Sequence, residues 1–292
     1  MKKTSEKIIE GGLAFSALIT ILTTIGILWV LISESIGFFR VVSIYDFITD
    51  TQWTPLFSQK HYGILPLLSG TFLTTAIAVA VALPIGLSIA IYLSEYAPKG
   101  FRKKIKPALE ILAAVPTVVY GFFALTVVTP FLQTFIPGLG SFNAMSAGIV
   151  MGIMIIPLIS SLSEDALFSI PKSLREASYG MGATKFQTAF KVSVPAASSG
   201  IVVSVILAIA RAIGETMIVS IAAGQQPILT MDPRDAVETI TAYIVQVSLG
   251  DVQHGSIEYK TIFAAGITLF IFTFILNNIS YLIKKKYQEK YE

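Results

Sequence analysis

Cysteine is absent from the 292 residues, and histidine occurs only at His61 and His254. Without cysteine the chain can form no disulfide framework, no thiolate metal site and no cysteine nucleophile. Both histidines stand in polar segments, so a zinc cluster and a Ser-His-Asp triad also lack their parts. The sequence therefore predicts neither a catalytic residue nor a metal site.

Charge is also scarce. Only 13% of the residues are charged, against about 25% in an average soluble domain. The net charge of +3 is small, and no cluster of Lys and Arg alternates with aromatic residues, so nucleic acid is not an expected partner. Hydrophobic residues make up 54% of the chain and are gathered in long runs, which indicates a membrane protein with several spans.

Six apolar runs reach the length of about 20 residues that a helix needs to cross a bilayer. The fold class predicted from them is an all-α integral membrane protein with six transmembrane helices. The first run follows Lys2, Lys3 and Lys7 as a signal peptide would, but it is too long for one and is interpreted as a retained anchor. The six predicted spans are 12–33, 65–94, 108–135, 144–163, 197–222 and 261–283.

The distribution of positive charge predicts the orientation. Sixteen of the 21 Lys and Arg residues fall on the N-terminus, the 95–107 loop, the 164–196 loop and the C-terminus. Four fall on the opposite side, and Arg211 lies inside a span. Because cytoplasmic loops carry the excess of positive charge, both termini are expected in the cytoplasm.

The chain is expected to divide into three parts. These are an anchor helix with the first external loop (1–64), a core of five helices (65–283) and a cytoplasmic tail (284–292). No G-x4-G-K-[ST] phosphate loop occurs anywhere, so no ATP site of that kind is expected in this chain.

The cytoplasmic segment 164–196 contains the spacing E-A-S-x3-G-x9-V-x-V-P, from Glu176 to Pro195. The residues around Glu176 favour or tolerate a helix, and Gly180 and Gly182 then permit a sharp turn. Apolar residues at 186, 189 and 190 predict a second short helix with one apolar face. The segment is interpreted as a compact docking element.

This spacing resembles the EAA loop of ATP-binding-cassette importer permeases, with Ser178, Val192 and Val194 as conservative departures. In that family the short helix of the loop sits in a groove of a cytoplasmic ATPase subunit. The resemblance implies a separate ATPase that binds the ATP, with no cofactor in this chain. It also implies a coupling role for Glu176, Ala177, Ser178, Gly182 and Pro195.

A second group of polar residues, Arg211, Glu215 and Thr216, lies inside the fifth apolar run. Each charge at such depth costs at least ~2.5 kcal/mol, so both should face the bundle interior or a wet cavity. Positions i and i+4 share a helical face, and the two charges can pair there. The pair either fixes packing only or handles an anion, with Arg211 donating to an oxyanion and Glu215 accepting a hydrogen bond from a protonated oxyanion such as hydrogen phosphate.

Several blocks resemble the PstC-type permease subunits of phosphate importers. The resemblance implies a type I importer fold, a phosphate pathway that includes Arg211, Glu215 and Thr216, and a place in the cytoplasmic (inner) membrane of a prokaryote. It also implies a PstA-type second permease, a PstB-type ATPase dimer and a PstS-type external binding protein as partners. The blocks are RAIGETM at 211–217, YLSEYAP at 92–98, VPTVVYGFF at 115–123 and LSEDAL at 162–167.

Other functions stay open at this point. Within the family, the chain could be the PstA-type partner or a permease for another oxyanion, although Ile213 and Met217 favour the PstC type. From other classes, it could be a secondary transporter in which Glu215 carries a coupling proton. It could also be a membrane scaffold or sensor that uses its cytoplasmic loop only for docking.

Overall fold

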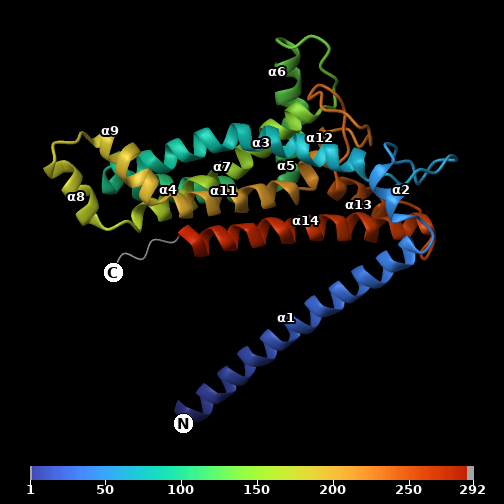
Figure 1. Cartoon of the computed structure of the whole chain (residues 1–292), viewed down its shortest axis with the longest axis horizontal. Coiled ribbons are helices and arrows are strands. Elements are labelled where there is room, and N and C mark those ends of the chain that lie inside the picture. Colours follow the sequence, from blue (N-terminus) through green and yellow to red (C-terminus); the bar gives the residue numbers. More distant parts are fainter. Residues whose placement is uncertain (1, 288–292) are drawn as a thin grey trace.

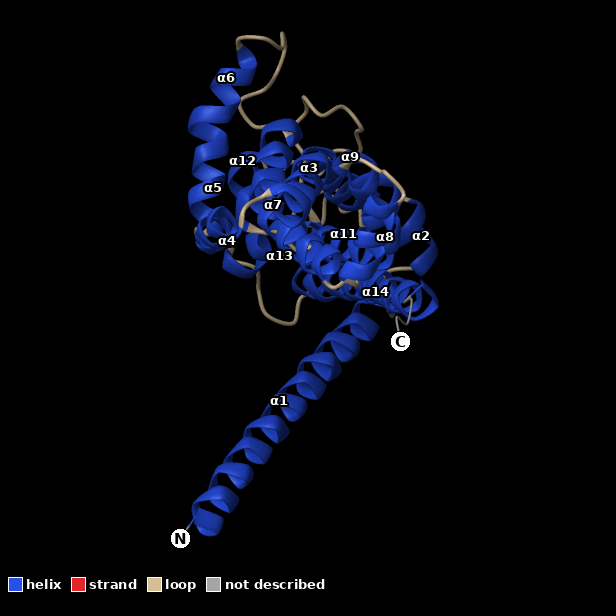
Figure 2. Ribbon diagram, turned by 90° about the vertical axis from the view of Figure 1, so that its left-hand side faces the viewer, coloured by secondary structure: helices blue, strands red, loops and turns tan. Residues whose placement is uncertain are grey.

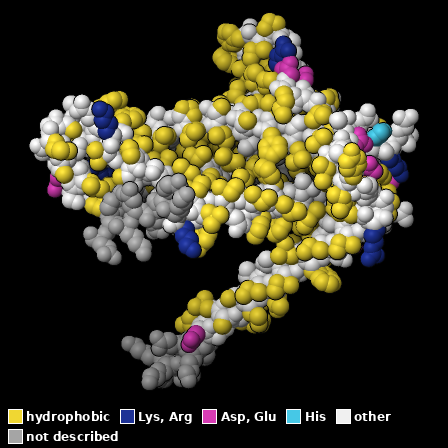
Figure 3. Space-filling model, in the orientation of Figure 1, with side chains coloured by type: hydrophobic (Ala, Val, Ile, Leu, Met, Phe, Trp, Pro, Cys, Tyr) yellow, Lys and Arg dark blue, Asp and Glu magenta, His cyan; other side chains and the backbone are white. Residues whose placement is uncertain are grey.

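The computed structural model describes residues 2–287, so residues 288–292 of the predicted tail lie outside it. Within residues 2–287 the chain is helical, with two isolated β-bridges and no strand (Figure 2). Hydrophobic side chains cover the middle of the visible face, and charged ones lie mostly toward its ends (Figure 3). The predicted all-α membrane fold is confirmed.

Four helices among the described residues are long and apolar enough to cross a membrane, and two bent pairs raise the number to six. The long helices are α1 (Lys2–Phe39), α3 (Leu65–Ile91), α7 (Ala144–Phe168) and α14 (Ile257–Tyr287). The first bent pair joins α4 (Lys99–Ala114) to α5 (Thr117–Phe123) and α6 (Thr129–Gln133) at 83°. The second runs from α9 (Lys185–Thr188) and α10 (Val194–Ala196) into α11 (Ser198–Ile213) at 71°.

Shorter helices and π-helical turns complete the chain. The π-helical turns are Tyr92–Tyr96, Ala124–Val128 and Ala189–Ser193, and the short helices are α2 (Ile44–Thr49), α8 (Lys172–Gly180), α12 (Met217–Ala222) and α13 (Ile240–Leu249).

Two predicted spans are divided in the structure. The run 108–135 is broken because Pro116 restricts Val115 to an extended conformation, with ψ 130°. The run 197–222 is broken where α11 ends at Ile213, and three residues separate it from α12, which begins at Met217. The segment 223–260, predicted to lie outside the membrane, contains the apolar helix α13.

Helices α3 and α7 form the centre of the bundle (Figure 1). Two glycines on α7 let the backbones approach: a Cβ at Gly148 would lie 2.7 Å from the Ile77 Cβ, and one at Gly152 would lie 2.8 Å from the Ala78 carbonyl oxygen. Small residues at crossings are the usual means of close packing between membrane helices.

We expect Gly152→Leu to destabilise the fold by about 3 kcal/mol, the upper end of overpacking costs. The measurement is the fraction of monodisperse protein after detergent extraction, by fluorescence-detected size exclusion. Gly12→Leu is the matched control, because a Cβ at Gly12 meets nothing within 4 Å. Equal monodisperse fractions for the two variants would show that the α3–α7 contact tolerates a side chain.

Helix α1 extends away from the bundle (Figure 1). It contacts α14 near its own C-terminal end, where the Ser35 hydroxyl donates to the Phe263 carbonyl at 2.9 Å. Most of its large apolar side chains, including Leu13, Leu22 and Trp29, are exposed. Large exposed apolar surfaces of this kind mark contact with a membrane or with another protein.

Candidate functional site

The docking element lies at one end of the bundle, and α2 and α13 lie at the other (Figure 1). Its two short helices, α8 and α9, confirm the predicted helix–turn–helix. Gly182 has φ +82° in the turn between them, a value that glycine adopts without the usual Cβ penalty. Thr184 then caps α9 in a reciprocal capping box with Gln187.

The predicted coupling residues of this element face different ways. Glu176 and Ala177 are exposed on α8, so a partner subunit can reach them. Ser178 is buried, and its Oγ lies 2.9 Å from the Thr188 Oγ1, so it fastens α8 to α9 instead of facing outward. Pro195 lies just before the 71° bend into α11.

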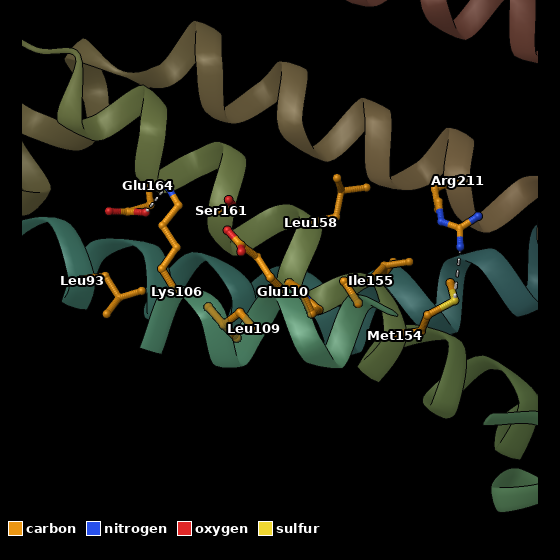
Figure 4. A pocket seen from close by; sticks show the side chains of 12 residues that line it. Leu93, Lys106, Leu109, Glu110, Met154, Ile155, Leu158, Ser161, Glu164 and Arg211 are labelled. Atoms are coloured by element: carbon orange, nitrogen blue, oxygen red, sulfur yellow. Dashed lines mark hydrogen bonds and ion pairs between the residues drawn. The ribbon is translucent and has the colours of Figure 1, made fainter. Parts of the chain in front are cut away.

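A cavity of about 260 Å³ lies between α4, α7 and α11 (Figure 4). Arg211 stands at one end of it, and Lys106 and Glu164 stand at the other. Arg211 is exposed, and its Nη2 lies 4.0 Å from the Met154 sulfur. The lining residues are Leu93, Lys106, Leu109, Glu110, Ala113, Met154, Ile155, Pro157, Leu158, Ser161, Glu164 and Arg211.

The expected pair of Arg211 and Glu215 on one helical face is wrong, because α11 ends at Ile213. Glu215 is buried, and its Oε1 accepts from the backbone N–H groups of Met217 at 3.1 Å and Ile218 at 3.4 Å. A carboxylate there satisfies free N–H groups at the start of α12.

Thr216 precedes α12 and is half-buried. Of the three predicted pathway residues, the structure brings only Arg211 into the cavity.

A family model described as "binding-protein-dependent transport system inner membrane component" matches residues 82–289. The chain belongs to this family. It is therefore an integral inner-membrane permease, the transmembrane part of an ABC importer, and its predicted resemblance to PstC-type permeases is confirmed by the relatives that follow.

The permease is 40% identical over 235 residues to the probable ABC transporter permease protein YqgH of Bacillus subtilis. The aligned region covers 80% of this chain and 75% of that protein. It is 33% identical over 296 residues to the phosphate transport system permease protein PstC of Haemophilus influenzae, and the aligned region covers 94% of this chain and 92% of that protein.

Solved structures share its fold. The match to the inward-facing MetNI methionine ABC transporter has a TM-score of 0.58 at 19% identity and covers 76% of this chain and 95% of that one. The match to a bacterial ABC transporter involved in alginate import has a TM-score of 0.55 at 16% identity and covers 91% and 99%. The predicted permease fold of ABC importers is confirmed.

The permease fastens its docking element to the bundle through Arg175 on α8. Its guanidinium donates to the Glu95 carboxylate at 3.0 Å and to the carbonyls of Leu167 at 2.7 Å and Ile170 at 3.2 Å. Glu95 belongs to the π-helical turn after α3, Leu167 lies in the last turn of α7, and Ile170 lies two residues beyond the end of α7. We call this group the Arg175 clamp; it ties α8 to the two central helices at once.

A second cluster joins α4 to α7. Glu164 is buried and forms ion pairs with Arg102 and with Lys106, whose Nζ lies 3.3 Å from Oε2. Lys106 also reaches Asp165 at 2.8 Å. No specific role was predicted for these residues or for the Arg175 clamp. The available signal was that Glu95 and Glu164 are acids at the ends of apolar runs.

A buried carboxyl lies in the loop before α13. Glu238 is buried, and its Oε1 makes no hydrogen bond within the described part of the chain. Its backbone carbonyl packs closely against Gly70 of α3, where an added Cβ would lie only 2.2 Å from the carbonyl oxygen. Burial raises the pKa of Glu238 from 4.5 to about 8, because a low dielectric disfavours the charged form.

The folded permease therefore binds a proton on the Glu238 carboxyl more tightly than the unfolded chain does. The stability gained from the proton is fully present below pH 4.5 and is lost as the pH rises through about 8. We expect the apparent melting temperature of the wild type to fall between pH 5 and pH 8 by more than that of Glu238→Gln, whose amide does not titrate. Parallel curves of melting temperature against pH for the two proteins would contradict this.

Proposed function

We propose that this permease forms half of the translocation pathway of an ATP-driven phosphate importer. The observation that carries the proposal is Arg211, an arginine without an ion pair among the described residues that lines the cavity between α4, α7 and α11. An unmatched guanidinium is a strong donor for an oxyanion. The similarity to phosphate permeases over most of the chain supports phosphate as that oxyanion.

The proposed partners are a PstA-type permease for the other half of the pathway, a PstB-type ATPase dimer and a PstS-type external binding protein. The ATPase would hold the ATP, and this chain would hold no cofactor. Both termini would lie in the cytoplasm, because the positive loops lie on their side of the membrane. The exposed residues Glu176 and Ala177 and the turn at Gly182 would meet the ATPase.

The proposed mechanism is alternating access. ATP-driven closure of the ATPase dimer would move α8, and the Arg175 clamp would pass that movement to α3 and α7. The pathway would then open outward and receive phosphate from the binding protein. Resetting after hydrolysis would open the cavity toward the cytoplasm, where phosphate leaves Arg211. Ser178 would keep α8 fixed to α9 during this movement, and Pro195 would keep the bend into α11 rigid.

Proton-coupled transport is the rival mechanism. Glu215, the carboxyl first expected to carry the coupling proton, is buried and already accepts hydrogen bonds from two backbone N–H groups. We therefore propose that Glu215 and Thr216 lie beside the pathway, where the Glu215 carboxylate holds the start of α12. A scaffold or sensor would have no use for an unmatched arginine in a cavity.

The test is uptake of radiolabelled phosphate into proteoliposomes that contain this permease, its partner permease, the ATPase and the binding protein. We expect uptake that requires ATP and is unaffected by excess sulfate. Uptake that sulfate abolishes would leave an importer for a different oxyanion. Uptake driven by a proton gradient without ATP would overturn the importer proposal.

A further inference from the structure

The cavity contains polar groups well away from Arg211. Glu110 from α4 and Ser161 from α7 lie between its two ends, and Lys106 stands one turn before Glu110 on the same helix (Figure 4). Met154, beside Arg211, and Ser161 are seven residues apart on α7, which corresponds to about 10 Å along the helix. One small oxyanion cannot touch both places, so these groups form a separate location within the cavity.

The charges at this location are incompletely matched. Glu164 is paired with Arg102 and Lys106, and Asp165 is paired with Lys106. No ion pair to Glu110 forms within the part of the chain that the structure describes. Lys106 has three N–H donors and two carboxylate partners, so it retains a donor for a ligand.

A cation, a hydroxyl and an unmatched carboxylate together suit a ligand that is an anion and also a hydrogen-bond donor. Hydrogen phosphate is such a ligand, because its charged oxygens accept from Lys106 and Ser161 while its P–OH donates to Glu110. Sulfate has no proton at neutral pH, so Glu110 would repel it.

We propose that Lys106, Glu110 and Ser161 form a second hydrogen-phosphate site on the cytoplasmic side of Arg211, in which Glu110 accepts the hydrogen bond from the ligand's hydroxyl. The inference rests on the proposed function, since it adds a second stage to the same pathway. Phosphate released by Arg211 passes the apolar wall at Leu158 and is bound again before it leaves. Several weak sites in series let an ion both enter and leave a pathway.

The test is equilibrium binding of radiolabelled inorganic phosphate to the nucleotide-free complex of both permeases and the ATPase, without the binding protein, in the presence of excess sulfate. We expect wild type to retain phosphate. Glu110→Gln should retain about tenfold less, which corresponds to the loss of one charge-assisted hydrogen bond. Glu110→Asp keeps the carboxylate and should recover part of the binding.

Glu10→Gln on the exposed part of α1 is the matched control, and size exclusion verifies the assembly of each complex. Sulfate-resistant binding that is equal in wild type and Glu110→Gln, or no such binding in wild type, would overturn the second site. If those complexes still take up phosphate with ATP, the proposed function stands and only the second site is wrong. If wild type takes up no phosphate, both proposals fail.

Discussion

Arg211→Ala should lower ATP-dependent phosphate uptake at least about 100-fold while the ATPase remains docked. The guanidinium can donate two parallel hydrogen bonds to an oxyanion, and losing about 2.8 kcal/mol of such binding gives the 100-fold effect. The measurement is the initial rate of radiolabelled phosphate uptake by the reconstituted complex. The uptake rate of Arg211→Lys should fall between those of wild type and Arg211→Ala, because lysine keeps the positive charge but cannot donate two parallel hydrogen bonds.

Arg234→Ala is the control for loss of an arginine. Arg234 is exposed in the loop before α13 and pairs with Asp232, away from the cavity. An uptake rate near that of wild type is expected for it. Wild-type uptake by Arg211→Ala would mean that phosphate does not depend on this side chain.

Arg175→Ala should separate ATP hydrolysis from transport. It removes all three bonds of the Arg175 clamp and leaves the Glu95 carboxylate, whose side chain is only 4% exposed, without its cation. Breaking a buried ion pair in this way costs about 3–5 kcal/mol locally. We expect α8 to move without α3 and α7, so that the number of ATP molecules hydrolysed per phosphate imported rises at least about tenfold, the effect of 1.4 kcal/mol.

The ratio of ATP to phosphate distinguishes this role from a structural one. A misassembled complex would lose hydrolysis and uptake together, and its ratio would not report on coupling. Arg175→Lys keeps the ion pair with Glu95 and should give a smaller rise. Lys172→Ala, an exposed change on the same helix, should leave the ratio at the wild-type value. A wild-type ratio in Arg175→Ala would show that movement reaches the bundle by another route.

Apolar length predicted where the spans are but not where they break. Pro84 and Pro157 lie inside continuous helices, whereas Pro116 and the residues after Ile213 mark real breaks. Composition does not distinguish these cases, because packing against neighbouring helices decides whether a span continues. The pairing of Arg211 with Glu215 was predicted wrongly for the same reason, since it required a helix that continues past Ile213.

The candidate site was predictable where its signal was local. Arg211 is conspicuous as a charge within an apolar run, and the turn at Gly182 follows from the spacing of its own segment. Glu95 and Glu164 were not predicted, because their partners come from other helices. Glu110 was not predicted, because only the packing of α4 beside α7 places it in the cavity. No spacing along the chain relates Glu95 to Arg175, which lies 80 residues away.

The absence of cysteine permits a direct test of the central claim, that phosphate passes through the cavity beside Arg211. Leu158→Cys places a single thiol in the cavity wall, and Ile111→Cys places one on an exposed position of α4 that does not line it. Each variant complex is labelled with an anionic thiol reagent, with and without saturating phosphate, and labelling of this chain is measured by mass. We predict that phosphate slows labelling at Leu158→Cys several-fold and leaves Ile111→Cys unchanged, whereas equal labelling at Leu158→Cys with and without phosphate would contradict the account.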